Sequence, residues 1–366
     1  MINFKKIFKK DITLYLILTI FCFYSFFGSI IQGRYIYDGY HWGLVASAAN
    51  EFLYGKVLYK EVFVHYGILT TLFHSLALKI YNSIFSLIFL SSLFYVSGTV
   101  FLTFIVKKFT NAYYCYLLLY LFFFFQPFTV YPWHTYFAYF FLVFGLFLYL
   151  YKNTYSYFLF GICIQLVYLS SNSFKIYVYL IFSLTLILIY FENKYEIKIL
   201  IRQSLAFIIG FFLPFLLFIV YLKNLGAYEH WLQSDISQIF LKIENKSIFI
   251  FIYQLFLTYI ASLKSILSKP YIIFGLMINL SCLYFILNSI SKKKTLNYNL
   301  LFISIFSILL NHMLVLHFNT FRVFNGLIIG VVVLFYILSL TKNIEIKEFI
   351  ILFLILLAPL ANPFAK

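Results

Sequence analysis

Apolar runs long enough to cross a lipid bilayer recur along the whole chain, and they constrain the fold more than any other feature. A helix needs roughly 17–25 predominantly apolar residues to span the hydrocarbon core. Hydrophobic residues make up 64% of the chain and charged residues 10%, whereas soluble domains carry about 25% charged residues. The runs are continuous, without the polar–apolar alternation of membrane β-barrel strands. The sequence therefore predicts an all-α polytopic membrane protein.

We expect about eleven transmembrane helices in one transmembrane domain that covers residues 1–366, with no soluble domain. Each expected helix coincides with one apolar run between polar segments. The expected spans are 12–32, 83–106, 112–128, 133–151, 155–170, 175–191, 204–222, 270–290, 299–318, 323–340 and 349–365.

Lysines and arginines set the expected orientation, because cytoplasmic loops carry an excess of them. The N-terminal segment MINFKKIFKKD is basic, and the apolar run after it is too long for a removable signal peptide and lacks a small-residue cleavage site. We therefore expect an uncleaved anchor with a cytoplasmic N-terminus in a bacterial inner or plasma membrane. The net charge of +16 then reflects topology, and no nucleic-acid partner is expected.

Two polar segments are expected on the external face, residues 33–82 and 223–269. In the first, Trp42, Val45 and Ala49 follow helical spacing, which predicts an amphipathic helix in the membrane interface that ends at Gly55. Residues 67–80 are apolar but short, and we expect a second juxtamembrane helix there. In the second segment, residues 248–268 are expected to be interfacial or re-entrant, because a crossing would place Lys292–Lys294 outside.

The eleven acidic residues divide between the two expected faces. None falls in the middle of a span, where ion-coupled transporters place ionisable residues. The external acids are Asp38, Glu51, Glu61, Glu229, Asp235 and Glu244. The cytoplasmic acids are Asp11, Glu192, Glu196, Glu345 and Glu348, which we expect to be solvated loop charges. Polar chemistry is therefore predicted at the external membrane face.

Arg322 and Lys175 are the basic residues on that face that best suit a phosphate group. Arg322 follows the HFNTF turn beside an apolar span, and Lys175 closes the SSNSFK turn. A guanidinium binds phosphate through two parallel hydrogen bonds. The alternative stays open for both residues, since a long basic side chain at a helix end also extends toward lipid headgroups.

Several short motifs on this face resemble those of the membrane-embedded GT-C glycosyltransferases. They occur in the family's order and are DGYH (38–41), GKVLYKE (55–61), HYGILTT (65–71), GAYEHWLQSDI (226–236) and HFNTFRVFNG (317–326). The closest similarity is to a bacterial branch that acts in lipopolysaccharide and polysaccharide assembly, related to the protein mannosyltransferases and the RgtA/B/C/D-like proteins. Two features depart from the family pattern: Ile68 replaces the usual proline, and no C-terminal soluble domain follows.

The resemblance implies inverting transfer of a hexosyl or pentosyl unit from a polyprenyl-phosphate-linked donor to a glycan, lipid or protein acceptor, without a further cofactor. Asp38 is expected to be the catalytic general base, and Lys175 and Arg322 the binding residues for the departing phosphate. The other expected substrate-binding residues are His41, Glu61, His65, Tyr66, Trp231 and Asp235.

Alternatives remain beside this interpretation. Asp38 also suits the N-cap of the helix that follows it. Glu51 is interpreted as a solvated residue, and His65, His74 and His134 are open between functional and interfacial or core roles. No sequence motif predicts a metal site, and the four cysteines lie in apolar runs as expected for buried thiols. The second function class is a polysaccharide polymerase, a lipid-linked sugar flippase or a transporter.

Overall fold

The computed structural model describes residues 12–32, 39–125, 132–234, 253–254, 256–258, 260, 271–291, 297–311, 323–324 and 326–360, and these are almost entirely helical. Five of the described helices are long and apolar enough to cross a membrane. They are α2 (Ile12–Gln32), α5 (Ile84–Phe109), α9 (Lys175–Asn193), α10 (Ile197–Asn224) and α13 (Tyr271–Ser291). The chain is thus a membrane-associated helical protein, as the continuous apolar runs predict.

Shorter helices complete the described part of the chain. They are α3 (Gly39–Leu53), α4 (Ile68–Ile80), α6 (Ala112–Phe125), α7 (His134–Tyr149), α8 (Thr154–Ser170), η1 (Asn172–Phe174), α14 (Tyr298–Leu309), η3 (Leu327–Gly330), α16 (Val331–Leu340) and α17 (Ile344–Leu360). The amphipathic helix expected to end at Gly55 and the helix expected at 67–80 are present as α3 and α4. Gly55, at φ +89°, follows α3 as expected for a residue that ends a helix.

The described helices differ from the expected spans at several places; α17, for example, begins at Ile344, ahead of the expected start at 349. α10 begins at Ile197, ahead of the expected start at 204, because Lys198 and Arg202 are good helix formers and do not interrupt the helix. The expected span 323–340 is divided into η3 and α16. Gly330 ends η3, and a Cβ there would lie 2.6 Å from Cγ2 of Ile278. The total of eleven spans therefore remains a prediction.

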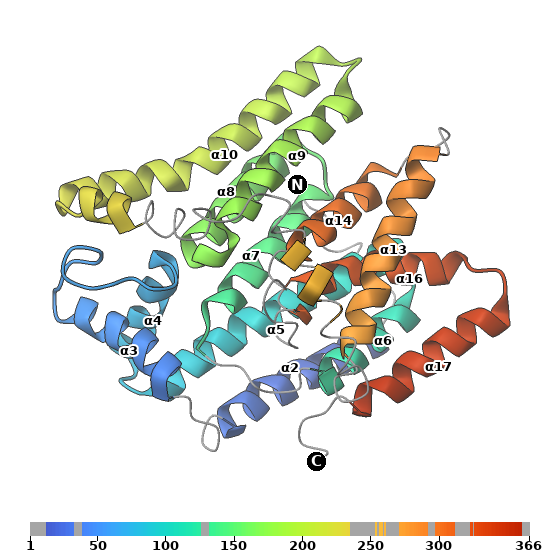
Figure 1. Ribbon diagram of the computed structural model, residues 1–366, viewed down its shortest axis with the longest axis horizontal. Helices are drawn as coiled ribbons and strands as arrows, with labels where there is room; N and C mark the ends of the chain where they lie inside the picture. Colours follow the sequence, from blue (N-terminus) through green and yellow to red (C-terminus); the bar gives the residue numbers. More distant parts are fainter. Residues whose placement is uncertain are drawn as a thin grey trace.

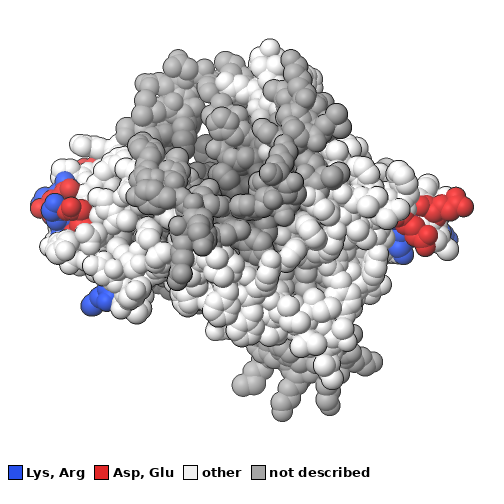
Figure 2. All heavy atoms as spheres, turned by 90° about the horizontal axis from the view of Figure 1, so that it is seen from below, with Lys and Arg blue, Asp and Glu red and all other residues white. Residues whose placement is uncertain are grey.

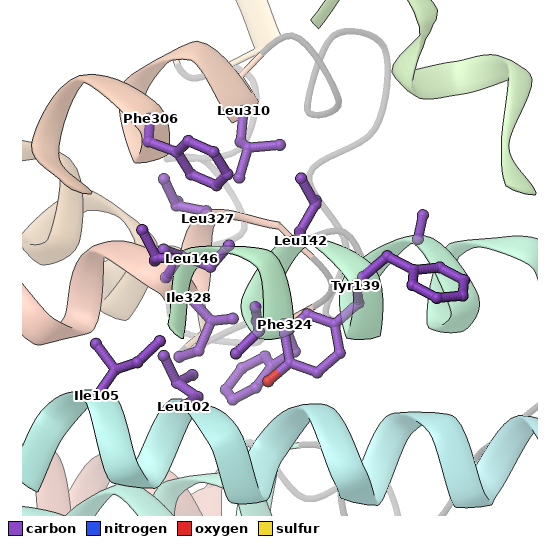
Figure 3. Packing of buried hydrophobic residues seen from close by; sticks show 14 of the residues in the cluster. Leu102, Ile105, Tyr139, Leu142, Leu146, Phe306, Leu310, Phe324, Leu327 and Ile328 are labelled. Atoms are coloured by element: carbon purple, nitrogen blue, oxygen red, sulfur yellow. The ribbon is translucent and has the colours of Figure 1, made fainter. Parts of the chain in front are cut away.

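The core of the molecule is formed by helices that pack closely around α7, whose residues are nearly all buried. Gly98 lets α5 approach α7, since a Cβ there would lie 2.6 Å from Cε1 of Tyr139. Gly161 and Gly210 do the same where α8 crosses α10, because a Cβ at either would overlap backbone carbonyl atoms of the other helix. Figure 3 shows side chains of α5, α7 and the end of α14 meeting those of Phe324, Leu327 and Ile328 in this core.

One end of these helices holds a basic, hydrogen-bonded group of turns. Lys152, in the turn between α7 and α8, forms an ion pair with Glu192 at the end of α9, and Lys108 Nζ donates to the Leu150 carbonyl at 2.7 Å. The hydroxyls of Tyr149 and Tyr157 also donate to Glu192, at 3.5 and 3.4 Å. Glu192 has only 9% of its side chain exposed. The expectation that Glu192 is solvated is therefore wrong, because helix packing encloses it beside a lysine and two hydroxyls.

On one face of the molecule, the charged side chains of the described residues lie away from the middle (Figure 2). On the face drawn in Figure 2, those of the described residues gather at the two ends of the long axis, and the described surface between them is uncharged. Such a surface is favourable in a hydrocarbon layer, where an isolated charge is costly.

Candidate functional site

The candidate site lies at the other end of α8, where the loop after α3 meets the turn between α8 and α9. The contact is close: at Gly67 a Cβ would lie 2.7 Å from the Leu169 carbonyl oxygen. The Thr70 hydroxyl donates to the Ser170 carbonyl at 2.8 Å. Gly67 is therefore required for backbone approach, and α4 begins against the end of α8.

A second pair of hydrogen bonds joins the same segments. The Asn172 backbone N–H donates to the Tyr66 carbonyl at 2.6 Å, and Asn172 Nδ2 donates to the His65 carbonyl at 3.0 Å. Asn172 lies 107 residues from His65 in the sequence. The backbone of the HYG turn (residues 65–67) is thus held in place by the SSNSFK turn (residues 170–175).

His134, the first residue of α7, completes the junction. Its Nδ1 lies 2.6 Å from Ser171 Oγ, and its ring stacks on that of Tyr66 at a centroid distance of 4.5 Å. His134 is 4% exposed. The sequence alone leaves the role of His134 open, and it is not among the expected site residues. Its position directly after Pro132–Trp133, at the start of an apolar run, is the signal that could have indicated it.

Lys175 begins α9 and is buried, with 8% of its surface exposed. Its Nζ lies 5.4 Å from the centroid of the Tyr168 ring, a distance at which a cation is attracted to an aromatic face. The N-terminus of a helix itself carries a partial positive charge. A buried ammonium at this position therefore creates a local positive potential, and an anion would be stabilised there.

The loop 55–62 folds over the end of α10. Tyr59 adopts φ +68°, and burial raises the pKa of its hydroxyl. Its ring lies 6.5 Å from that of Phe218. The Glu61 carboxylate accepts the Val57 backbone N–H at 2.7 Å. In this structure Glu61 therefore stabilises its own loop.

Trp231 packs against the end of α10 on the same side of the molecule. Its ring lies 5.4 Å from Phe218 and 6.1 Å from Phe215, and it is 6% exposed. Its aromatic surface is therefore occupied by core contacts. Glu51, interpreted as a solvated residue, pairs with Lys56 near the end of α3.

The expected site residues thus fall into two groups. The described members Glu61, His65, Tyr66, Lys175 and Trp231 lie at one end of the molecule, and His65, Tyr66 and Lys175 are linked through the 170–175 turn. Asp38, Asp235 and Arg322 lie outside the described residues, and of His41 only the helical backbone is described. Within the described chain, no group of three or more His, Cys, Asp or Glu side chains is arranged to hold a metal ion.

Comparison of the chain with protein-family models, curated proteins and solved structures gives no match. The resemblance to GT-C glycosyltransferases therefore rests on the sequence motifs alone, and the described geometry is the independent ground for a functional proposal.

Proposed function

We propose that the protein is a multi-pass glycosyltransferase of a bacterial plasma membrane, which transfers a sugar from a polyprenyl-phosphate-linked donor to a cell-envelope acceptor. The observation that supports this most is the buried ammonium of Lys175 at the N-terminus of α9, joined through one short turn to the fixed HYG segment. A buried cation at a helix N-terminus favours the phosphate that such a donor releases.

In the proposed reaction, an acceptor hydroxyl oxygen attacks the anomeric carbon of the donor sugar. The bond between that carbon and the phosphate oxygen breaks, and the phosphate leaves with the electron pair. Asp38 takes the hydroxyl proton as the general base. Lys175 and Arg322 stabilise the negative charge that develops on the departing phosphate. The reaction needs no oxidant or further cofactor.

The basic group around Lys108 and Lys152 supports the proposed orientation. It lies at the end of α8 away from Lys175, where cytoplasmic loops are expected to be basic. The candidate site then faces the outside of the cell.

The test is transfer by the purified protein from radiolabelled polyprenyl-phosphate-linked hexoses and pentoses to an envelope glycan extract. We expect Lys175→Gln to lower kcat by about 10²–10³-fold, in line with the loss of one charged group that stabilises a developing anion. Lys60→Gln serves as the matched control, since Lys60 is an exposed lysine at the same end. Normal turnover by Lys175→Gln would remove Lys175 from the mechanism.

Asp38→Asn is the second variant. We expect it to abolish transfer while the protein still purifies as a folded species. Unchanged turnover would exclude Asp38 as the base, and absence of transfer by the unaltered protein from every donor tested would count against the glycosyltransferase proposal itself.

A lipid-linked sugar flippase is the second candidate, and one observation favours it. Five polar side chains lie buried along one helix, α5: Ser91, Ser92, Tyr95, Thr99 and Thr103. Polar groups within a membrane helix commonly mark a substrate path. A flippase would move a fluorescent polyprenyl-phosphate sugar across vesicle membranes without forming a glycosidic product, which separates the two candidates.

A further inference from the structure

We propose that the side chains of Phe63, His65, Tyr66 and Trp133 form a stacking platform for the acceptor saccharide. The role of this saccharide as acceptor rests on the proposed function.

The four side chains form a continuous row of rings. Ring centroids lie 5.6 Å apart between Phe63 and His65, 4.4 Å between His65 and Tyr66, and 4.7 Å between Tyr66 and Trp133. Phe63 is 63% exposed, His65 is exposed, and Tyr66 and Trp133 are half-buried. The row therefore leads from the surface of the loop to the start of α7.

The row is rigid for an exposed loop. Asn172 fixes the backbone at His65 and Tyr66 with two hydrogen bonds, and the ring of the buried His134 stacks on the Tyr66 ring. A surface held in its binding conformation loses little conformational entropy when a ligand binds. An exposed aromatic row whose backbone is held by hydrogen bonds in this way can serve as a recognition surface.

A saccharide suits this surface better than lipid chains do. A pyranose presents an apolar C–H face that can lie on an aromatic ring, and hydroxyls that need polar partners at its edge. His65 supplies a polar ring within the row, and the Asn172 turn leads directly to Lys175, where the donor phosphate is proposed to bind. The row and Lys175 are therefore joined through the same turn, whereas acyl chains on the row would bring apolar groups against these polar ones.

Tryptophan fluorescence tests the platform without any assay of transfer. The chain has three tryptophans, and Trp42 and Trp231 are buried at 3% and 6% exposure. The probes are methyl pyranosides of glucose, galactose, mannose and N-acetylglucosamine, and linear tetrasaccharides of the same sugars, added to protein in nanodiscs. We expect a saturable shift in tryptophan emission that is lost in Trp133→Phe. In Phe63→Ala we expect the affinity for the saccharide to fall about three- to tenfold.

Phe349→Ala is the matched control, because Phe349 on α17 is 69% exposed and distant in the sequence. It should leave the shift unchanged. Absence of a shift with every saccharide would overturn the platform, and so would strong quenching of Trp133 by brominated acyl chains without a saccharide response, which would indicate a membrane anchor.

Different results would reject the glycosyltransferase activity and the saccharide platform. A saccharide-dependent shift in a protein that catalyses no transfer would retain the platform and reject the transferase. Transfer whose acceptor KM is unchanged in Phe63→Ala and Trp133→Phe would retain the transferase and reject the platform. If both hold, these variants should raise the acceptor KM and leave kcat nearly unchanged.

Discussion

His74 is fully buried in α4, and neither of its ring nitrogens has a hydrogen-bond partner among the described residues. Its ring lies against that of Phe137, at 5.3 Å between centroids. α4 has 13 residues and is too short to span a bilayer. Burial lowers the pKa of His74 to about 3 from an ordinary value of 6.5, since the charged imidazolium is disfavoured away from water.

This shift predicts that acid destabilises the protein. The unfolded chain binds a proton at His74 below about pH 6.5, and the folded chain does so only near pH 3. The contribution to stability is therefore complete above pH 6.5 and is lost as the pH falls from 6.5 toward 3. We expect a loss of up to about 1.4 kcal/mol per pH unit in that range. Thermal unfolding in detergent, compared between the unaltered protein and His74→Leu, measures it.

The variant should show the shallower pH dependence. Parallel pH profiles for the unaltered protein and His74→Leu would contradict the prediction.

Glu192 is expected to stabilise the fold, because it is buried beside Lys152 and two tyrosine hydroxyls. Glu192→Gln should lower the free energy of unfolding by about 1–3 kcal/mol, because Lys152 loses its ionic partner and the charge-assisted bonds from Tyr149 and Tyr157 weaken. Glu196→Gln is the control, since Glu196 is exposed and its side chain does not cap α10. Denaturation of the purified variants would test this, and equal effects of the two substitutions would contradict it.

Among the helices, the crossing of α8 and α10 depends on two glycines, one on each helix. Gly161→Ala and Gly210→Ala should each destabilise the protein by about 1–3 kcal/mol, because the added methyl group would press on the backbone of the facing helix. Gly43→Ala is the matched control within a helix, since a Cβ there meets nothing within 4 Å. It should be neutral or slightly stabilising, as alanine favours helices.

The prediction is tested by measuring the melting temperatures of the three variants and of the unaltered protein in one detergent. If Gly161→Ala and Gly210→Ala melt like the unaltered protein, the close crossing is not a determinant of stability.

For the whole molecule, the separation of the two polar ends gives a topology prediction. Lys60 and Lys194 are both exposed, the first beside the candidate site and the second in the turn between α9 and α10. In intact cells, a membrane-impermeant maleimide should label Lys60→Cys and leave Lys194→Cys unlabelled. The native thiols are buried or half-buried, so background labelling should be low.

Opening the cells should expose Lys194→Cys to the reagent, which confirms that the residue can react. Labelling of both positions in intact cells, or of Lys194→Cys alone, would contradict the proposed orientation.

The sequence by itself determined several of the helical elements of this protein. Apolar runs and a few breakers locate α2, α3, α4 and α9 closely, because these signals act over one or two helical turns. It also indicated Lys175 and the HYG turn, since polar residues between apolar runs are conspicuous.

Only the tertiary structure decided which of these segments meet. The bonds from Asn172 to His65 and Tyr66 join residues more than a hundred positions apart, and no local pattern encodes them. Burial was decided in the same way: Lys175 and Glu192 look like loop charges in the sequence, yet helix packing encloses both. Their energies depend on the neighbours that packing supplies, and those neighbours come from distant parts of the chain.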